Sequence, residues 1–376
     1  MEVAVNFDLS EDQQMLKALA ERFILDHYDH DKRRAYQAKA PGFARENWLK
    51  LGELGLLAAP IAEEDGGLGL DATGIATLCE ALGHGLVVEP FAESLLCATR
   101  LFAAIAPEAL RAQWMDKLLD GSRRICLAHA EEGARDGHIW ITTRAEQQAD
   151  HYVLNGAKAY VVAGCQADGY IVSARLSGAP HEASEVGLFF VPADQSGLHH
   201  RDWPMVDGLY ASSLQFHNVQ LPHSARLQGD LSALAEIEIM ARLGRTAEAL
   251  GIMQRLFNDT LEYLKTREQF GTAIGSFQAI QHRMVAQYAA IEQSRALLMR
   301  ALVAENAQDF AASVSGVRAY VAEASVSLGH EMIQFHGGMG VTDELAIGAG
   351  HKRLLMLSRW PENALAALDE YAAKVA

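Results

Sequence analysis

The sequence predicts an α+β protein in which a helical segment, a β segment and a second helical segment follow one another. Apolar residues recur with a helical period over residues 8–120, alternate with a period near two from residue 121, and return to the helical period after Pro222. We therefore expect an N-terminal helical domain at 1–120, a middle β domain at 121–228 built as a small barrel or sandwich, and a C-terminal four-helix bundle at 229–376.

Within the N-terminal segment, Ser10 followed by Glu11 and Asp12 is typical of a helix start. Further helical stretches are expected at 48–57 and 72–82, with a turn-rich loop at 63–69 between them.

Short β-rich runs bounded by Gly, Asp or Pro predict the strands of the middle domain. They are Ile125–His129, His138–Thr143, Tyr152–Asn155, Tyr160–Val162, Tyr170–Arg175, Val186–Val191 and Ser213–Phe216. After Pro222 the helical period predicts three long helices and a shorter one. They span Leu231–Lys265, Phe277–Glu305, Ala311–His336 and Glu362–Lys374.

Composition is that of an ordinary globular protein. Of the 376 residues, 50% are hydrophobic and 21% are charged. A net charge of −16 gives no overall field that would attract nucleic acid or an anionic membrane. The chain begins without the basic start and apolar core of a signal peptide, and no run approaches the roughly 18 apolar residues of a membrane span. We expect a cytoplasmic protein.

Cysteines and histidines show no ligand pattern. The four cysteines lack CxxC spacing, so we expect free thiols. The fifteen histidines form no HExxH or other ligand-spaced cluster, so we predict no metal site and a structural role for His199, His200 and His336.

Two late segments carry residue types that suit a phosphorylated ligand. Thr266–Gly271 places Arg267 beside an aromatic ring and amides, and Phe277 and Gln278 follow. A guanidinium suits bidentate contact with phosphate. Gln334–Gly340 contains three glycines where a helix should run on, which lets backbone N–H groups approach an anion. Together the segments predict half of a dinucleotide site.

The α–β–α order and several motifs together resemble the acyl-CoA dehydrogenases over essentially the whole chain. The matching segments lie at 9–16, 48–70, 155–161, 249–254, 263–271 and 333–345. The last segment, with the Lys-Arg-Leu at 352–354, resembles the small subunits of heteromeric dehydrogenases of the pimeloyl-CoA and steroid side-chain type.

The resemblance implies an acyl-CoA dehydrogenase-like fold, FAD as cofactor and α,β-desaturation of an acyl-CoA. A carboxylate would take the α-proton, N5 of FAD the β-hydride, and an electron-transfer flavoprotein the electrons. Whether the acyl group is a fatty acyl, a dicarboxylate or a steroid side chain is left open.

The resemblance also carries cofactor contacts onto eight positions. They are Arg267, Gln269, Phe270, Phe277, Gln278, Gln334, Gly337 and Gly338. Arg267, Gln269 and Phe270 match residues that reach across a dimer interface to the pyrophosphate and adenine of the neighbour's FAD. Phe277 and Gln278 match a pair on the adenine side. Gln334, Gly337 and Gly338 match a second pyrophosphate contact. The alternative is that the arginine forms a helix-end salt bridge and the glycines only end a helix.

The half of the site that should hold the flavin ring departs from the family pattern. Ala130 stands where a threonine hydroxyl would contact the ring, and Glu132 replaces a proline. In the next flavin-contacting strand, Val162 replaces a second threonine. Two lost hydroxyls suggest that the ring is absent or held differently, and the alternative is that backbone N–H groups still bind it.

No catalytic base stands at either position that the family uses. These positions hold Ser358 and Ala241, which cannot take an α-proton without further activation. Asp343 and Glu344 fit an ordinary helix start better than a base, and Arg242 fits a packing ion pair as well as an active-site role. Solvent-facing charges are expected at Glu236, Glu238 and Glu248. The catalytic residue stays unidentified.

The residues that would contact a neighbour's FAD across the interface match the family, whereas those that would hold a flavin ring in this chain's own site do not. This difference favours an α2β2 heterotetramer. A homologous partner would supply the flavin-ring pocket and the base, and this chain would supply phosphate contacts across the interface. Two alternatives stay open: a self-sufficient homomeric dehydrogenase with a relocated base, and a non-catalytic subunit that stabilises its partner.

Overall fold

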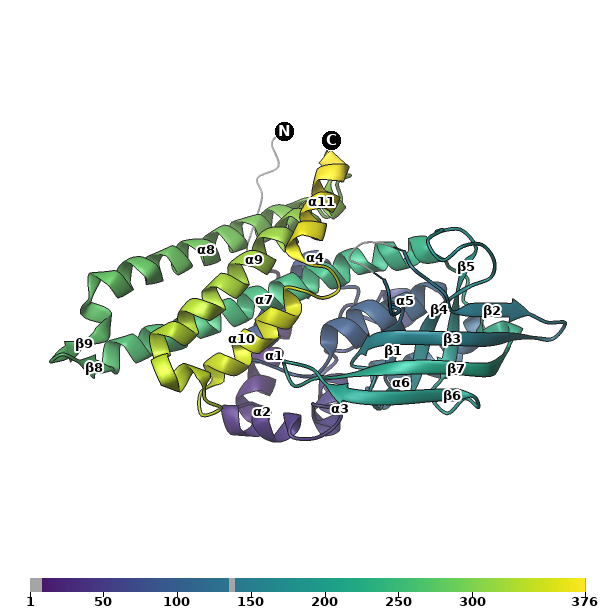
Figure 1. Ribbon diagram of the computed structural model, residues 1–376, viewed down its shortest axis with the longest axis horizontal. Coiled ribbons are helices and arrows are strands. Elements are labelled where there is room, and N and C mark those ends of the chain that lie inside the picture. The colour runs from purple at the N-terminus through teal and green to yellow at the C-terminus, as the bar shows by residue number, and fades with distance from the viewer. Residues whose placement is uncertain (1–8, 135–138, 376) are drawn as a thin grey trace. The chain divides into compact units, whose positions relative to one another are not determined.

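The computed structural model describes residues 9–134 and 139–375 (Figure 1). The chain forms two compact units, each built from separate stretches of sequence. A helical unit contains residues 9–33, Ala72–Val87 and 242–375, and a sheet unit contains Arg34–Asp71 and Val88–Ala241. Among the described helices, none combines the length and the apolar run that crossing a bilayer requires.

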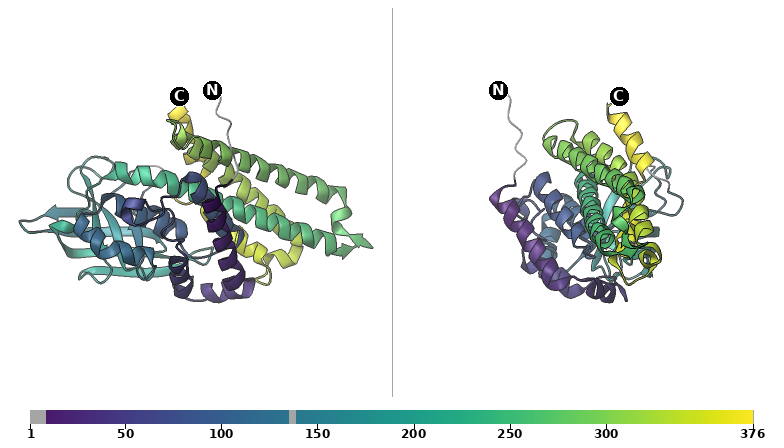
Figure 2. Two further views of the ribbon diagram at one scale, coloured as in Figure 1. Left: turned by 180° about the vertical axis from the view of Figure 1, so that it is seen from behind. Right: turned by 90° about the vertical axis from the view of Figure 1, so that its left-hand side faces the viewer.

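The helical unit is dominated by long helices, and α9 packs against α8, α10 and α11 (Figures 1 and 2). Its elements are α1 (Glu11–His27), α4 (Ala72–His84), most of α7 (Leu231–Thr266), β8 (Glu268–Gln269), β9 (Thr272–Ala273), η4 (Ile274–Ser276), α8 (Gln278–Val303), α9 (Phe310–His336), η5 (Gly337–Val341), α10 (Ala346–Leu357) and α11 (Ala364–Val375). The helix α2 (His30–Gln37) runs across the division between the units.

All four helices predicted for the bundle are present, as α7, α8, α9 and α11. The helix α10 was missed because glycines at 348 and 350 weaken a helical reading. Gly350 serves packing, since a Cβ there would lie 2.6 Å from the side chain of Leu256 on α7.

The start of α1 is capped as the sequence predicts. The Ser10 hydroxyl accepts the Gln13 N–H at 3.2 Å, and the Gln13 side chain accepts the Ser10 N–H at 3.0 Å. This reciprocal capping box satisfies two backbone donors that the first helical turn leaves open.

Two glycines let α4 and α7 approach closely. A Cβ on Gly83 would lie 2.2 Å from the carbonyl oxygen of Glu248, and one on Gly251 would lie 2.1 Å from that of Glu80. Any larger residue would force the two backbones apart, so these glycines set the helix separation.

The sheet unit surrounds one seven-stranded sheet with short helices. Its helical elements are α3 (Arg45–Glu53), η1 (Glu63–Asp65), the fully buried π-helix η2 (Phe91–Thr99), α5 (Arg100–Ile105), α6 (Glu108–Leu119) and η3 (His223–Ala225). The strands are β1 (Ile125–Ala128), β2 (Arg144–Gln147), β3 (His151–Val162), β4 (Gly169–Arg175), β5 (Val186–Pro192), β6 (Leu198–Pro204) and β7 (Tyr210–Pro222).

The strand order is β1-β4-β2-β3-β7-β6, and β5 pairs with β4. The strands β1 and β2 run parallel to β4, and the remaining pairs are antiparallel. Inward-facing apolar side chains, among them Leu154, Val172, Phe189 and Leu214, form the core of this unit.

Three details of the predicted sheet were wrong. The strand expected at His138–Thr143 begins at a residue outside the described part, and 139–143 are not a strand; β2 begins at Arg144. The N–H groups of Thr142 and Thr143 donate to the Glu131 carboxylate, so they are withdrawn from strand pairing. The strand β6 was missed because most of its residues are exposed and show no apolar alternation.

The third error concerns residues 152–162, where the sequence predicts two separate strands. Both predicted strands belong to the single strand β3, and the register shifts between Leu154 and Gly156. A bulge takes the place of a break between strands because Gly156 adopts φ +142° and packs where a Cβ would lie 2.6 Å from the Cα of Thr143.

Candidate cofactor site

The two glycine- and arginine-containing segments lie at the same end of the helical unit. The rings of Tyr263, on the last turns of α7, and His336, the last residue of α9, stack with centroids 4.3 Å apart. His336 is buried, and its Nδ1 lies 2.8 Å from the carbonyl oxygen of Met332. The structural role predicted for His336 therefore agrees with its contacts.

Beyond α7 the chain forms the hairpin β8–β9, which extends past the ends of α7 and α8 (Figures 1 and 2). Phe270 and Gly271 form its tip with φ of +55° and +79°. The Phe270 ring is 94% exposed, and the Phe277 ring meets it edge-to-face at 6.3 Å. The Phe270 ring at the hairpin tip and the Phe277 ring at the start of α8 thus form an exposed surface on which a planar base can stack.

Arg267 directly follows α7; its backbone is hydrogen-bonded, whereas its side chain has no partner in the described part of the chain. Its N–H donates to the carbonyl of Tyr263 and its carbonyl accepts the Ile274 N–H, both at 2.8 Å. In the described part of the chain, no carboxylate or other side chain pairs with the Arg267 guanidinium, which is exposed. The salt-bridge alternative for this residue is therefore not what the structure contains. A cation without an internal partner is available for an anionic ligand.

The glycine turn begins where α9 ends. Gly337 has φ +58° and ψ −137°, a conformation that residues with a Cβ strongly avoid, and its N–H donates to the Gln334 carbonyl. A Cβ at Gly337 or Gly338 would meet nothing within 4 Å, so both backbones face open space. Gly340 differs, because a Cβ there would lie 2.5 Å from the carbonyl oxygen of Ile333.

The remaining predicted contacts also reach solvent. Gln278 begins α8 directly after Phe277, and Gln334 lies on the last turn of α9. The side chains of both are exposed, while the Gln269 amide donates to the Glu268 carbonyl beside it. One end of the helical unit thus combines a free cation, exposed backbone at two glycines, amides and aromatic rings.

Family sequence models match three stretches of the chain. They are the N-terminal, middle and C-terminal domains of acyl-CoA dehydrogenase, at residues 10–122, 126–219 and 237–360. The chain belongs to the acyl-CoA dehydrogenase family. Its α+β fold is that of the family, and it is an oxidoreductase with FAD as cofactor.

Individual relatives are distant but span nearly the whole chain. The L-prolyl-[peptidyl-carrier protein] dehydrogenase of Serratia sp. (strain ATCC 39006) is 28% identical over 91% of this chain and 91% of its own length. The mitochondrial short-chain specific acyl-CoA dehydrogenase of Homo sapiens is 28% identical over 79% of this chain and 74% of its own.

Solved structures agree with this assignment. A steroid ACAD, Tcur3481-Tcur3483, superposes with a TM-score of 0.86 at 27% identity, covering 97% of this chain and 98% of the other. PigA with FAD and proline superposes with a TM-score of 0.91 at 25% identity, covering 99% of each chain.

The residues at the end of the helical unit fit the phosphate and adenine portions of FAD. The free Arg267 guanidinium and the exposed backbone at Gly337 and Gly338 are donors suited to phosphate. The Phe270 and Phe277 rings suit the adenine.

The two family positions for the catalytic base carry no carboxylate. Ala241 is fully buried on α7, and the buried Ser358 hydroxyl donates to the Leu355 carbonyl. Asp343 and Glu344 lie on the surface just beyond η5, and Asp343 lies 3.8 Å from the Lys352 amine.

Arg242 forms ion pairs within the helical unit. Its Nε lies 3.2 Å from Glu362 and its Nη1 lies 2.6 Å from Glu370 on α11. The same Nη1 donates to the Ser315 hydroxyl on α9 at 3.0 Å. These contacts join three segments of the unit, in line with the packing interpretation.

Two of the three α7 glutamates predicted to face solvent do not. Glu248 accepts both Nε and Nη2 of Arg353, at 2.7 and 3.0 Å, and its side chain is 13% exposed. Glu238 is half-buried, and the Cys97 thiol in η2 lies 3.6 Å from its carboxylate. Glu236 is exposed as predicted. The errors arise because α7 is covered on several faces, which a single helix pattern does not reveal.

The sheet unit contains a buried polar network that sequence reasoning missed. The Lys158 ammonium donates to the Glu131 carboxylate at 2.6 Å, and the two side chains are 0% and 2% exposed. Burial lowers the pKa of Lys158 to about 8, although the charge of Glu131 acts in the opposite direction. Burial would raise the pKa of Glu131, but the charge and hydrogen bonds of Lys158 and the hydrogen bonds from Thr142 lower it overall. The lysine of the motif at 155–161 was the available signal.

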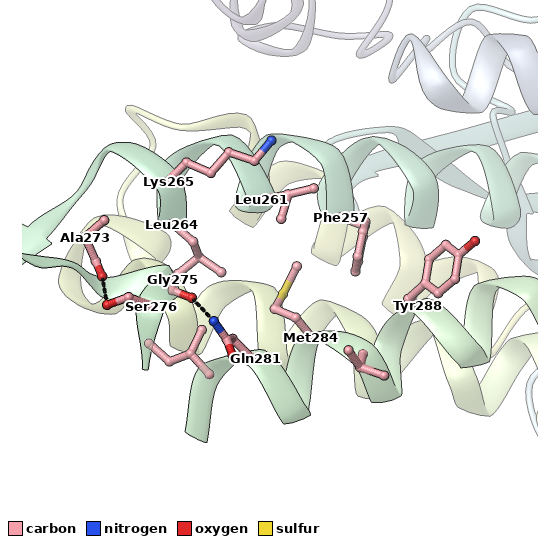
Figure 3. Close-up of a pocket in the computed structure, with 12 residues that line it drawn as sticks. Phe257, Leu261, Leu264, Lys265, Ala273, Gly275, Ser276, Gln281, Met284 and Tyr288 are labelled. Carbon is pink, nitrogen blue, oxygen red and sulfur yellow. Dashed lines mark hydrogen bonds between the residues drawn. The ribbon is translucent and has the colours of Figure 1, made fainter. Parts of the chain in front are cut away.

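A groove of about 580 Å³ lies between α7 and α8. Figure 3 shows Phe257 and Leu264 of α7 and Met284 of α8 projecting into it. The residues that line it include no carboxylate or histidine, so the groove offers no evident base for an α-proton.

Proposed function

We propose that this chain takes part in FAD-dependent α,β-desaturation of an acyl-CoA thioester. The observation that carries the proposal is that the unpaired Arg267 guanidinium and the exposed backbone of Gly337 and Gly338 lie at the same end of the helical unit. A cation and exposed backbone N–H groups at one end suit the pyrophosphate of FAD.

In this proposal each residue has a defined task. Arg267 binds a pyrophosphate oxygen through a charge-assisted hydrogen bond, and the N–H groups of the glycine turn bind a second one. Phe270 and Phe277 stack against the adenine, while Gln278 and Gln334 donate or accept at its edges and at the phosphates. When bound, FAD supplies the acceptor for the β-hydride, and electrons then pass to an electron-transfer flavoprotein.

We further propose an α2β2 heterotetramer in which the chain lends these contacts to FAD across an interface. The absence of a carboxylate at Ala241 and Ser358 supports a homologous partner that supplies the base. The Mycobacterium tuberculosis ChsE4-ChsE5 complex has the same fold, with a TM-score of 0.88 at 24% identity over 99% of each chain. That structure is a complex of two components, which motivates a search for a partner of this chain.

A self-sufficient homomeric dehydrogenase is the second candidate, because Glu238 is half-buried on α7 one helical turn before Ala241. In this alternative its carboxylate would take the α-proton. Its contact with the Cys97 thiol would orient it.

Two preparations separate these possibilities: the chain expressed and purified alone, and the chain purified from its own cells together with any subunit that it binds. The heteromeric proposal expects that the chain alone fails to reduce a dye with acyl-CoA, and that a copurifying dehydrogenase subunit restores enoyl-CoA formation. A yellow homomer that forms enoyl-CoA alone would contradict it and favour the Glu238 alternative. A complex that keeps all its FAD after Arg267→Ala would instead indicate a stabilising, non-catalytic subunit.

A further inference from the structure

The two glycines of the proposed phosphate contact receive little support from neighbouring side chains. A Cβ at Gly337 or Gly338 would meet nothing within 4 Å. Upstream, the Gly337 N–H donates to the Gln334 carbonyl on the last turn of α9. Downstream, η5 ends at Val341, whose side chain is 75% exposed. The position of the exposed N–H groups therefore depends also on how this downstream end is anchored.

Thr342 ties the downstream end of the turn together. Its N–H and its hydroxyl both donate to the Met339 carbonyl, at 3.2 and 2.9 Å. Its hydroxyl oxygen accepts the Glu344 N–H at 3.4 Å. Residues 339–344 thus form one hydrogen-bonded segment, so a contact made at residue 343 acts on the glycine turn.

His30, the first residue of α2, holds this segment from outside. Its Nε2 lies 2.8 Å from the carbonyl oxygen of Asp343, which is 313 residues away in the sequence. Both residues belong to the helical unit. A backbone carbonyl can only accept, so Nε2 carries the proton and donates it. The Asp343 carboxylate also lies 3.8 Å from the Lys352 amine, but its side chain is 78% exposed, and an ion pair so exposed contributes little.

The second nitrogen of the same ring shows that His30 serves as a donor. Its Nδ1 is sealed from solvent and has no hydrogen-bond partner in the described part of the chain. A buried acceptor without a partner costs free energy, which an apolar side chain at this position would avoid. The polar contact that a histidine supplies here is therefore the Nε2–H bond to the segment after the glycine turn.

We propose that His30 is a positioning residue for the cofactor. Its hydrogen bond to Asp343 holds the turn in the conformation that presents the N–H groups of Gly337 and Gly338 to the FAD pyrophosphate. His30 acts through the turn and does not itself contact FAD. The inference rests on the proposed role of this turn in FAD binding, and not on the heterotetramer.

Gln37, at the other end of α2, provides a matched control. Its Nε2 donates to the Asp207 carbonyl at 2.6 Å, which is a bond of the same kind made within the sheet unit. Gln37→Leu therefore removes a side-chain tether of α2 without removing a contact of the glycine turn.

Titration with FAD compares the variants in the full chain, together with any subunit that copurifies. We expect His30→Leu to weaken FAD binding about tenfold, as for one weakened hydrogen bond to a charged group. His30→Gln keeps an amide donor and should recover most of the loss, and Gln37→Leu should leave FAD binding unchanged. Thr342→Val, at a half-buried position, loosens the same segment from within and should weaken FAD binding by a similar factor.

Hydrogen exchange without any ligand measures the turn directly. The backbone amides of residues 338–344 should exchange about tenfold faster in His30→Leu than in the unmodified chain or in Gln37→Leu, because the local opening costs less. FAD binding or exchange that is unchanged in His30→Leu, an equal loss in Gln37→Leu, or no recovery in His30→Gln overturns the inference. If Arg267→Ala weakens FAD binding but His30→Leu does not, only this inference fails. If neither does, the proposed role in FAD binding fails with it.

Discussion

The Tyr263 ring stacks on the His336 imidazole at 4.3 Å with an interplanar angle of 24°, and this contact joins the ends of α7 and α9. Arg267 follows four residues after Tyr263, and Gly337 follows His336 directly. The stack therefore holds the arginine segment and the glycine turn together, although more than 60 residues of chain separate them. Arg283 adds to the same region, since it lies over the Phe335 ring at 4.8 Å and pairs with Glu331.

Arg267→Ala should lower the affinity for FAD by about 10- to 100-fold, because a hydrogen bond to a charged group contributes about 1.5–3 kcal/mol. Titration of the purified protein or complex with FAD, followed by flavin fluorescence, measures the change. Arg300→Ala is the matched control, since Arg300 is an exposed arginine near the far end of α8. Equal losses in both variants would mean that only net charge matters.

Gly337→Ala should lower the free energy of unfolding by about 1–3 kcal/mol, because alanine is strained at φ +58° and ψ −137°. Gly338→Ala should cost less than about 0.5 kcal/mol, since its φ is not positive and a Cβ there meets open space. Urea denaturation of the two variants side by side gives the comparison. A Gly338 variant as unstable as the Gly337 variant would show that backbone strain is not the cause.

Removal of either member of the buried Lys158–Glu131 pair should destabilise the fold strongly. We expect Lys158→Met and Glu131→Gln each to cost about 3–5 kcal/mol, because each leaves a buried charge without its partner. The double variant should cost less than the sum of the two. Chemical denaturation of all four proteins completes the cycle, and strict additivity would argue against coupling of the two charges.

Acidification should destabilise the protein through His129. Its pKa is lowered from 6.5 to about 4 in the folded state, so between these values the unfolded chain binds the proton and the folded chain does not. The free energy of unfolding therefore falls as the pH drops below about 6.5, by roughly 2 kcal/mol from this group at pH 5. Urea denaturation at several pH values should show a shallower fall in His129→Leu than in His181→Leu, a control at an exposed histidine of the sheet unit. Identical slopes would contradict the assignment.

Much of the fold could be predicted because it depends on local patterns. The Ser10 capping box, the four long helices and most strands follow from residue spacing alone. The failures share a cause, which is that a distant partner overrides the local signal. Thr142 and Thr143 turn to Glu131 instead of extending a strand, and the glycines of α10 serve packing against α7.

The candidate site divides in the same way. Arg267 and the glycine turn could be found from residue type and spacing. The sequence could not show that the Arg267 guanidinium has no internal partner, or that the backbone of the glycine turn is exposed. The lowered pKa of His129 was beyond reach, because it depends on burial and on the charge of Lys158, which is remote in the sequence.

The sequence by itself determined the family, the order of helices and strands, the residue types suited to FAD and the lack of a carboxylate at the usual base positions. Only the tertiary structure decided which charged side chains form ion pairs inside the fold and which can still bind a ligand. Glu248, Arg242 and Lys158 form ion pairs inside the fold, while the exposed Arg267 guanidinium has no side-chain partner in the described part of the chain. The reason is that a side chain's partner is set by distance in space, and contacts between remote segments leave no periodic mark on the chain.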